Sequence, residues 1–453
     1  MTILPFLLCL QPTLSHTSLN QLAIICEAIF TLTGRVTMLG ISRLTNKGGS
    51  YRTIQRFFAS SLPWLNIFWL FFQHHIYLSD EIYLLAGDES VVTKAGNHTH
   101  GIDRFFASLL GKPVAGLSFF ALSLIAVNQR RSHPISIQQM VRTQEEKAAA
   151  KERTEARKMK KKNASKKASR PVGRPIGSKN KDKFLFSPTP ELCRIDAMVG
   201  ALLKLISDFL PLTYLVLDGH FGHNQALLMA KKNGLHIISK LHHNAALQEK
   251  FEGVYSGKGK PPIYGGRLDY QNLPEKYLKK TTTEKGIRTR YYQGEFLHKD
   301  FAQALNLVII VKTNLRTQKQ GNINLFSSDL SLGWEEMVEY YGLRFQIEFN
   351  FRDAKQHFGL EDFMNVSEQG VTNAANVSFF MENLSQAILK DQSQPGRING
   401  ILDLKSYFRG LKYAKETLKL LLEKPAPIIM EEIIEKVGSL GRIHSEIATP
   451  PTS

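Results

Sequence analysis

The sequence predicts an α/β protein in which a sheet with buried parallel strands lies between two helical regions. Three observations lead to this prediction. Residues 19–75 have helical patterns, short apolar runs typical of buried strands occur between residues 82 and 312, and residues 366–437 are again mostly helical. With 453 residues, the chain is long enough for two or three domains and a sizeable core.

The chain is strongly basic, with a formal net charge of +18 and a pI of about 9.6. This balance indicates a polyanionic partner, either nucleic acid or a membrane surface, unless the protein is simply a basic soluble one. The apolar run 62–72 is too short to span a bilayer, so we interpret it as a buried helix and expect no membrane partner. The cysteines lack metal or redox spacing, which favours a reducing cytoplasm: Cys9, Cys26 and Cys193.

Residues 1–78 are expected to form an N-terminal helical region. Its stretches 36–44 and 50–58 are short and amphipathic, and a glycine-containing turn joins them. This is the outline of a helix-turn-helix, in which Arg52 and Arg56 would contact DNA. A plain helical hairpin is the alternative.

Residues 79–365 are expected to form the α/β core, followed by a C-terminal helical region and tail over 366–453. Strands and helices alternate along this core: strands 82–86 and 116–127, helix 189–210, strand 214–218, helix 224–233, strand 236–240 and strand 306–312. The segment 248–300 is rich in Gly, Pro, Tyr and Lys, which indicates an irregular β-rich insertion.

A second insertion, 145–183, contains fifteen Lys or Arg and five Asp or Glu, and so contributes +10 of the net charge. Its alanine-rich first half favours a solvated helix. Its second half has two prolines and two glycines and cannot be regular structure, so we expect 145–183 as a whole to be a basic insertion, disordered or on the surface, until it meets a partner. The sequence 173–175, Gly-Arg-Pro, resembles an AT-hook, which would place Arg174 in an A·T-rich minor groove with Arg170 and Lys179 beside it. A generic polybasic tether is the alternative.

Three carboxylates are candidate metal ligands. Asp88 and Asp218 each end an apolar strand, and Glu348 lies on a helix that follows a later strand. Buried parallel strands that deliver acids at their carboxyl ends create a natural site. Such acids suit Mg²⁺ or Mn²⁺, and two ions can cleave a phosphodiester without a nucleophilic side chain. Each acid also has an ordinary explanation, as a turn former, a helix cap or a salt-bridge partner.

The helix predicted over residues 334–355 carries polar residues on one face. At 100° per residue, Tyr341, Arg344, Glu348 and Lys355 fall within roughly 60° of one another, with Arg352 beside them. Apolar residues fall on the opposite side, where a core would cover them: Leu343, Ile347 and Ala354. The polar face holds one carboxylate among cations, and Arg352 is either a phosphate contact or a structural partner of Glu348.

The spacing Tyr–(2)–Arg–(3)–Glu–(6)–Lys on this helix resembles the YREK signature of a large group of DDE transposases of bacterial insertion sequences. The segment 217–222 resembles the region of the second aspartate in that group, and 86–90 resembles the region of the first. Asp103 is a fallback for the first aspartate. The resemblance covers roughly residues 20–390.

This resemblance implies an RNase H-like mixed sheet flanked by helices, with Asp88, Asp218 and Glu348 as the catalytic acids. They would bind two Mg²⁺ or Mn²⁺ ions, while the other signature residues would hold DNA phosphates near the cleaved end: Tyr341, Arg344 and Lys355. It further implies a homodimer that cuts the element at its ends and joins the 3′-OH ends to target double-stranded DNA, acting on the nucleoid in the cytoplasm. The alternatives are an inactive transposase-derived DNA-binding protein and a general RNase H-like nuclease.

Three histidine groups remain, at 98–100, 220–223 and 242–243. Their spacing is loose and no cysteines accompany them, so phosphate contacts or ordinary surface positions are favoured over a zinc site. His220 is close to a proposed ligand, where it would support that ligand rather than bind metal.

Overall fold

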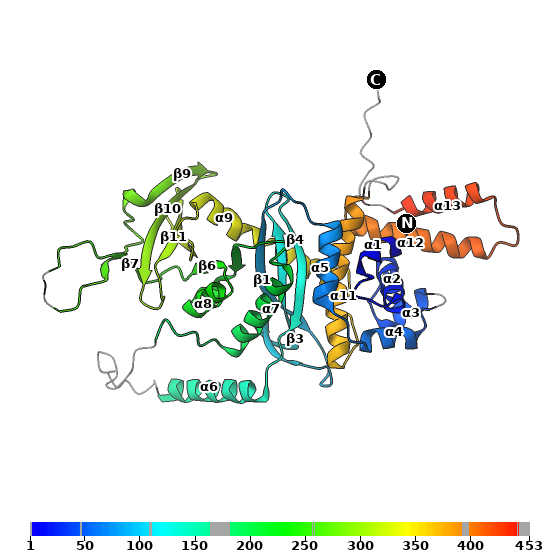
Figure 1. Ribbon diagram of the computed structural model, residues 1–453, viewed down its shortest axis with the longest axis horizontal. Coiled ribbons are helices and arrows are strands. Elements are labelled where there is room, and N and C mark those ends of the chain that lie inside the picture. The colour runs from blue at the N-terminus through cyan, green and yellow to red at the C-terminus, as the bar shows by residue number, and fades with distance from the viewer. Residues whose placement is uncertain are drawn as a thin grey trace, which may run out of the picture.

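The computed structural model describes residues 2–45, 48–107, 111–163, 182–255, 257, 259–391, 398–441 and 443. A mixed sheet runs through the middle of an elongated molecule, with helices packed against it and a helical region at one end (Figure 1). The predicted α/β class, a mixed sheet flanked by helices, is confirmed. Within the described residues, no helix is both long enough and apolar enough to cross a membrane.

The N-terminal region is helical, as the sequence predicts. Serine and threonine side chains cap three of its helices by accepting a hydrogen bond from a backbone N–H in the first turn, at Ser15, Thr37 and Ser50. Its helices are α1 (Leu4–Leu7), α2 (His16–Thr31), α3 (Met38–Leu44), α4 (Tyr51–Ala59) and α5 (Trp64–His75). The pair α3 and α4 confirms the two amphipathic helices, although residues 46 and 47 of their connection are outside the described part, and α5 confirms the buried helix.

The strands form one sheet over the described residues, in the order β2-β3-β1-β5-β6-β12-β11-β10-β7-β8, with β4 beside β3 and β9 beside β10. Strands β1, β5 and β6 are parallel to one another, whereas the other pairs are antiparallel. The first six are β1 (Tyr83–Thr93), β2 (Asp103–Ala107), β3 (Lys112–Ala126), β4 (Arg131–Gln139), β5 (Tyr214–Leu217) and β6 (His236–Leu241). The others are β7 (Leu247–Lys250), β8 (Tyr264–Arg267), β9 (Leu278–Glu284), β10 (Ile287–His298), β11 (Leu305–Asn314) and β12 (Gln320–Ser327).

The segment 248–300 is β-rich, as expected, but it does not form a separate layer. Its long strand β10 pairs with β11 over ten residues, so the insertion extends the central sheet. Strands β2, β4 and β12 were not predicted, because polar or glycine residues interrupt their apolar pattern. In β12, for example, only the last four of eight residues are buried.

Helices cover both faces of the central strands. Helices α7 (Pro190–Ile206) and α8 (Asn224–Lys232) pack on one face, whereas α9 (Trp334–Leu343) and α10 (Gln346–Gln356) lie on the other. Neighbouring residues of β6 show this division. Ile237 belongs to the apolar cluster that includes α7 and α8, and Ile238 belongs to the cluster that includes α9.

The predicted single helix over residues 334–355 is wrong, since α9 and α10 are separate helices joined at Arg344 and Phe345. The joint is a tighter turn in which the N–H of Phe345 bonds to Gly342 O at 3.2 Å and the N–H of Glu348 bonds to Phe345 O at 3.0 Å. These bonds reach back three residues, as in a 3₁₀ helix, so the 100° spacing does not hold across the joint. The expected apolar side chains are nevertheless buried: Leu343, Ile347 and Ala354.

The first half of the basic insertion forms α6 (Gln144–Asn163), so the predicted solvated helix is confirmed and the predicted disorder is wrong for residues 145–163. The AT-hook-like segment lies outside the described residues, together with Arg170, Arg174 and Lys179.

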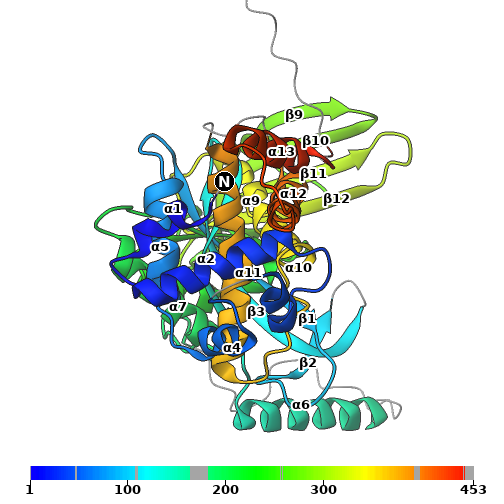
Figure 2. The same cartoon turned by 90° about the vertical axis from the view of Figure 1, so that its right-hand side faces the viewer.

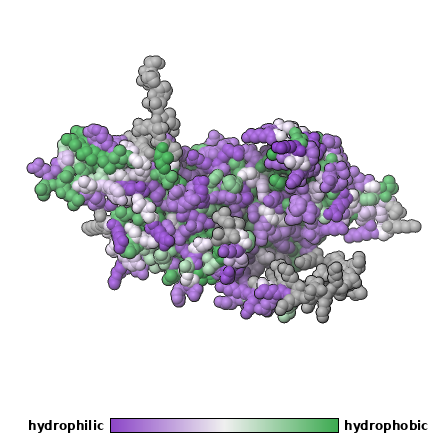
Figure 3. All heavy atoms as spheres, turned by 180° about the vertical axis from the view of Figure 1, so that it is seen from behind, coloured by the Kyte–Doolittle hydropathy of each residue, from purple (hydrophilic) through white to green (hydrophobic). Residues whose placement is uncertain are grey.

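Helix α11 (Glu368–Lys390) lies with α5 against β4, between the sheet and the other N-terminal helices, and α2 crosses in front of α11 in Figure 2. The last helices, α12 (Ile401–Lys419) and α13 (Pro427–Ser439), form a hairpin at the end of the molecule. Exposed side chains such as Leu420, Leu422 and Ile428 give this end apolar patches, seen at the left of Figure 3.

Asn373 of α11 fastens the N-terminal helices to the core. Its buried carboxamide accepts a hydrogen bond from Trp64 Nε1 at 2.8 Å and donates to the carbonyl oxygens of Phe58 and Ser60, both at 2.8 Å.

We expect Asn373→Ala to lower the free energy of unfolding by on the order of 3 kcal/mol, because a buried indole N–H and two carbonyls would lose their partner. Urea unfolding followed by Trp fluorescence measures this change. Asn97→Ala, at an exposed position, is the control. An unchanged unfolding midpoint for Asn373→Ala would show that this contact does not hold the helices.

Candidate active site

Parallel pairing of β1 with β5 sets two aspartates beside each other. The last paired residues are Gly87 of β1 and Leu217 of β5. Asp88 follows Gly87, and Asp218 follows Leu217. Neighbouring strands lie about 4.8 Å apart, so the two acids lie at the same level of the sheet on adjacent strands. The sequence predicted that Asp88 ends its strand, and this is wrong. Strand β1 continues to Thr93 through its pairing with β3.

Both aspartates point to the sheet face that α9 covers. Side chains two residues apart in a strand share a face, so Asp88 shares the face of Ala86, and Asp218 shares that of Val216. Ala86 and Val216 belong to the apolar cluster that includes Leu343 of α9. The aspartates therefore lie where this apolar layer ends, next to the joint of α9 and α10.

Gly87 allows β1 and its neighbours to approach closely beside the site. A Cβ atom there would lie 2.7 Å from Phe120 Cζ and 2.9 Å from Leu217 Cδ2. The neighbouring loop is equally close to β6, because a Cβ on Gly222 would lie 2.1 Å from the carbonyl oxygen of Lys240. Glycine at both positions lets the strand and the loop pack without displacement.

The loop after β5 orients Asp218. Its Oδ1 accepts the backbone N–H of His220 at 3.1 Å, which caps a short 3₁₀ turn over Gly219–Phe221. Ser239 of β6 donates its hydroxyl to the carbonyl oxygen of Asp218 at 2.7 Å. Asp218 is thus held through both its side chain and its backbone, which leaves carboxylate lone pairs for another ligand.

Arg344, in the joint between the two helices, connects the first and third predicted acids. Its Nη1 lies 2.7 Å from Asp88 Oδ2, and its Nη2 lies 3.5 Å from Glu348 Oε1. Burial raises the pKa of Asp88, and the nearby Asp218 raises it further, whereas the Arg344 guanidinium opposes both effects. The guanidinium is therefore the cation that balances the paired aspartates in this structure.

The three predicted acids are near one another but do not form a compact cluster. Asp88 and Asp218 are adjacent, while Glu348 is separated from Asp88 by the guanidinium and its side chain is 45% exposed. Among the residues that the structure describes, no group of three or more His, Cys, Asp or Glu side chains is arranged to hold a metal ion.

The other signature residues surround the acids. Tyr341 is half-buried, burial raises the pKa of its hydroxyl, and Arg344 Cζ lies 5.9 Å from the centre of its ring. Lys355 Nζ donates to the carbonyl oxygen of Val91 in β1 at 2.9 Å, so this lysine already braces the strand. Arg352 pairs with Asp353 at 2.7 Å, which makes Asp353 rather than Glu348 its carboxylate partner.

Sequence reasoning missed two acids next to this site. Glu89, on the opposite side of β1 from Asp88, accepts a hydrogen bond from the Ser118 hydroxyl, and burial raises the pKa of its carboxyl. Glu191, in the first turn of α7, lies 3.6 Å from His220 Nε2 and raises the pKa of that histidine. The position of Glu89 could have been inferred from its adjacency to Asp88, but nothing in the sequence pattern pairs Glu191 with His220.

The remaining predicted residues lie elsewhere. Asp103 is on β2, three strands from β5, where it faces Arg142 at 3.6 Å and Lys147 at 3.9 Å. Arg52 and Arg56 are exposed on α4. The histidines have local partners: His223 Nδ1 accepts the N–H of Ala226 at the start of α8, His242 contacts Asn244, and His100 lies 3.9 Å from Glu368.

A family model described as DDE superfamily endonuclease matches residues 9–295, more than half of the chain. The matched span includes Asp88 and Asp218 and ends within β10, before Glu348. No curated protein matches the chain.

We expect Asp88→Asn to stabilise the protein at neutral pH. Because the pKa of Asp88 is raised above its ordinary value of 3.8, protonated Asp88 favours the folded state, and this stabilisation is lost as the pH rises through the raised value. Asparagine stays neutral, so the variant should exceed the wild type in thermal stability at pH 7 and approach it below about pH 3.8.

Melting temperatures of both proteins across this pH range provide the measurement, with the exposed Asp80→Asn as control. A variant that is less stable than the wild type at pH 7 would mean that the ion pair with Arg344 outweighs burial and the repulsion from Asp218.

Proposed function

The chain belongs to the DDE superfamily endonucleases, and we propose that it is a DNA transposase that cuts an insertion element at its ends and joins the 3′-OH ends to target DNA. The observation that carries this proposal is the register of β1 and β5, after which Asp88 and Asp218 lie side by side. Their position at the carboxyl ends of parallel strands is typical of sites in α/β sheets. The basic net charge of +18 suits a DNA partner.

The donor set fits a divalent metal. The carboxylates of Asp88 and Asp218 lie at one level and repel each other, and the Arg344 guanidinium beside Asp88 offsets this repulsion, so a cation bound by both aspartates would do the same. Asp88 and Asp218 would hold Mg²⁺ or Mn²⁺, and Glu348 would join them once its contact with Arg344 is released. Two such ions, when bound, activate the attacking oxygen and stabilise the leaving oxygen of a phosphodiester.

Arg344 has two competing roles in this proposal. In the free protein its guanidinium binds Asp88 and Glu348. A DNA phosphodiester offers the fork two acceptor oxygens on one group, so both N–H groups can bind it at once, and this bidentate contact would draw Arg344 away from the acids. DNA binding would thereby free the carboxylates, while Tyr341 would add a hydroxyl donor or a stacking surface beside them.

Lys355 has a supporting role as well as a DNA-binding one. Its ammonium donates to Val91 O, three residues after Asp88, and lies 3.9 Å from Glu361. Burial lowers the pKa of Lys355, because it disfavours the charged ammonium form. A nearby anion stabilises that charged form. A phosphate beside Val91 would supply that charge. We further propose that two copies of the chain act together on the paired ends of the element.

The proposed activity requires strand cleavage and joining on DNA that carries the inverted repeats flanking the gene. With Mg²⁺ or Mn²⁺, the full-length protein should do both, whereas Asp88→Asn, Asp218→Asn and Glu348→Gln should each reduce the rate by about 10³-fold or more. Binding of the same DNA in EDTA should persist in all three variants. Glu339→Gln on α9 is the control, because Glu339 pairs with the exposed Arg130 and not with the acids.

The outcomes separate the alternatives. DNA binding without cleavage by the wild type would favour an inactive, transposase-derived DNA-binding protein. Cleavage without joining would favour a general nuclease. Full activity of the Asp218→Asn or Glu348→Gln variant would contradict the assignment of these acids.

A further inference from the structure

Helix α6 is anchored at its first turn by a capping box. The N–H of Thr143 donates to Glu146 Oε2 at 2.6 Å, and the N–H of Glu146 donates to Thr143 Oγ1 at 3.2 Å. Thr143 and Glu146 each satisfy the other's backbone donor, which fixes where the helix begins and how the chain enters it.

Ion pairs from neighbouring elements hold the same turn. Arg194 of α7 contacts both carboxylate oxygens of Glu146, at 3.0 and 3.3 Å. Asp103 of β2 faces both Arg142, just before the helix, and Lys147, in its first turn. The fork of Arg194 lowers the pKa of Glu146, so this carboxylate stays ionised and paired. Two different elements therefore fix the direction of α6.

Beyond this anchored turn, the helix extends into solvent. Lys151, Glu155, Lys158 and Met159 are exposed, and Figure 1 shows α6 along the lower edge of the molecule. The coloured part of its surface in Figure 3 is mostly hydrophilic. Burial of an apolar face does not explain a 20-residue helix in this position.

Charge along α6 is unevenly distributed. The sequence of the helix contains eight Lys or Arg and four Glu, and every charged residue after Glu155 is basic. The acidic residues lie nearer the positive end of the helix dipole and the basic residues nearer its negative end, which favours the helix. The free end of the helix is thus its most basic part.

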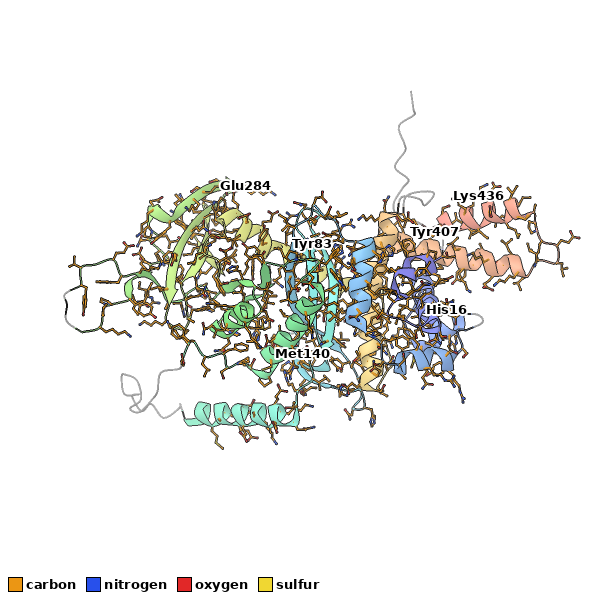
Figure 4. All side chains as sticks on the ribbon, viewed as in Figure 1. His16, Tyr83, Met140, Glu284, Tyr407 and Lys436 are labelled. Atoms are coloured by element: carbon orange, nitrogen blue, oxygen red, sulfur yellow. The ribbon has the colours of Figure 1, made fainter. Side chains whose placement is uncertain are left out.

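The helix leaves the sheet at the level of the proposed catalytic acids. Strand β4 runs in the same direction as β1, because both are antiparallel to β3. Gln139, the last residue of β4, is level with Phe119, which is in turn level with Ser90, two residues after Asp88. Figure 4 labels Tyr83, where β1 begins, and Met140, which follows the end of β4, at opposite ends of these strands.

Helix α7 connects the two sites directly. Its Glu191 pairs with His220, next to Asp218, and its Arg194, one turn further on, holds Glu146 of α6. The loop after Asp218 and the base of α6 are thereby fixed to adjacent turns of α7.

From this arrangement we infer that α6 is a rigid basic arm that binds the phosphate backbone of double-stranded DNA as it leaves the active site. The inference rests on the proposed function for the position of the cleaved end. A helix of 20 residues is about 30 Å long, which matches about nine base pairs at 3.4 Å each. The arm would add phosphate contacts along that length.

The contribution of charge is tested with Lys151→Ala/Lys158→Ala in the full-length protein. Each lost phosphate contact reduces the slope of log K against log salt by about 0.9, so the slope on a 40-base-pair duplex of mixed sequence in EDTA should fall by about 2. Lys415→Ala/Lys424→Ala, on exposed residues of the α12–α13 hairpin, removes the same charge far from α6 and should leave the slope unchanged. Equal slopes for both double variants would overturn the inference.

The contribution of rigidity is tested with Glu146→Ala against Glu155→Ala. Both variants raise the net charge by one, so charge alone predicts that both bind the same duplex as tightly as the wild type or more tightly. A fixed arm predicts instead that Glu146→Ala, which loses the Arg194 fork, binds about tenfold more weakly, because the helix must be ordered on binding.

If Glu146→Ala binds as tightly as Glu155→Ala, α6 is a flexible tether and the inference is wrong. Thermal unfolding of both variants checks that the fold is retained. These measurements need no metal and no cleavage, so they remain informative even if the protein neither cuts nor joins DNA.

Discussion

The parallel pairing of β1 with β5 is the constraint on which the rest of the site depends. It ends at Gly87 and Leu217, so the next residues, Asp88 and Asp218, lie at one level on adjacent strands. The chain packs closely around this point, with glycines at 87 and 222 where a Cβ atom would overlap neighbouring atoms. Burial and mutual repulsion make the pair unfavourable, so a nearby cation is needed.

Arg344 supplies that cation from an unusual place, the joint between α9 and α10. A continuous helix would have displayed the signature residues on one face, but the 3₁₀ turn instead directs the guanidinium between Asp88 and Glu348. The same residue can bind phosphate, which links DNA binding to release of the acids. Such a site lowers the stability of the fold in return for function, as is common where charged groups are placed to bind a ligand.

The helices and buried strands were predictable because their apolar periodicity is strong. Leu343, Ile347 and Ala354 were placed on the buried side, and the strands before Asp88 and Asp218 were found. The break at Arg344 was not predictable, since apart from Gly342 the residues around it suit a helix and packing decides their hydrogen bonds. Long-range pairs such as Arg194 with Glu146 and His220 with Glu191 also left no sequence pattern, because they depend on how distant elements meet.

Iron-mediated cleavage of the polypeptide tests most directly whether the three acids share a metal. Fe²⁺ replaces Mg²⁺ at oxygen-rich sites. With added hydrogen peroxide, which it reduces to hydroxide and hydroxyl radical, and with ascorbate to recycle the Fe³⁺, it cuts the nearby backbone. With DNA bound, the account predicts cuts near residues 88, 218 and 348, although these positions are far apart in the chain, and loss of all three sets of cuts in Asp218→Asn. Cuts confined to other segments, such as the histidines at 242 and 243, or an absence of cuts near residue 348, would contradict it.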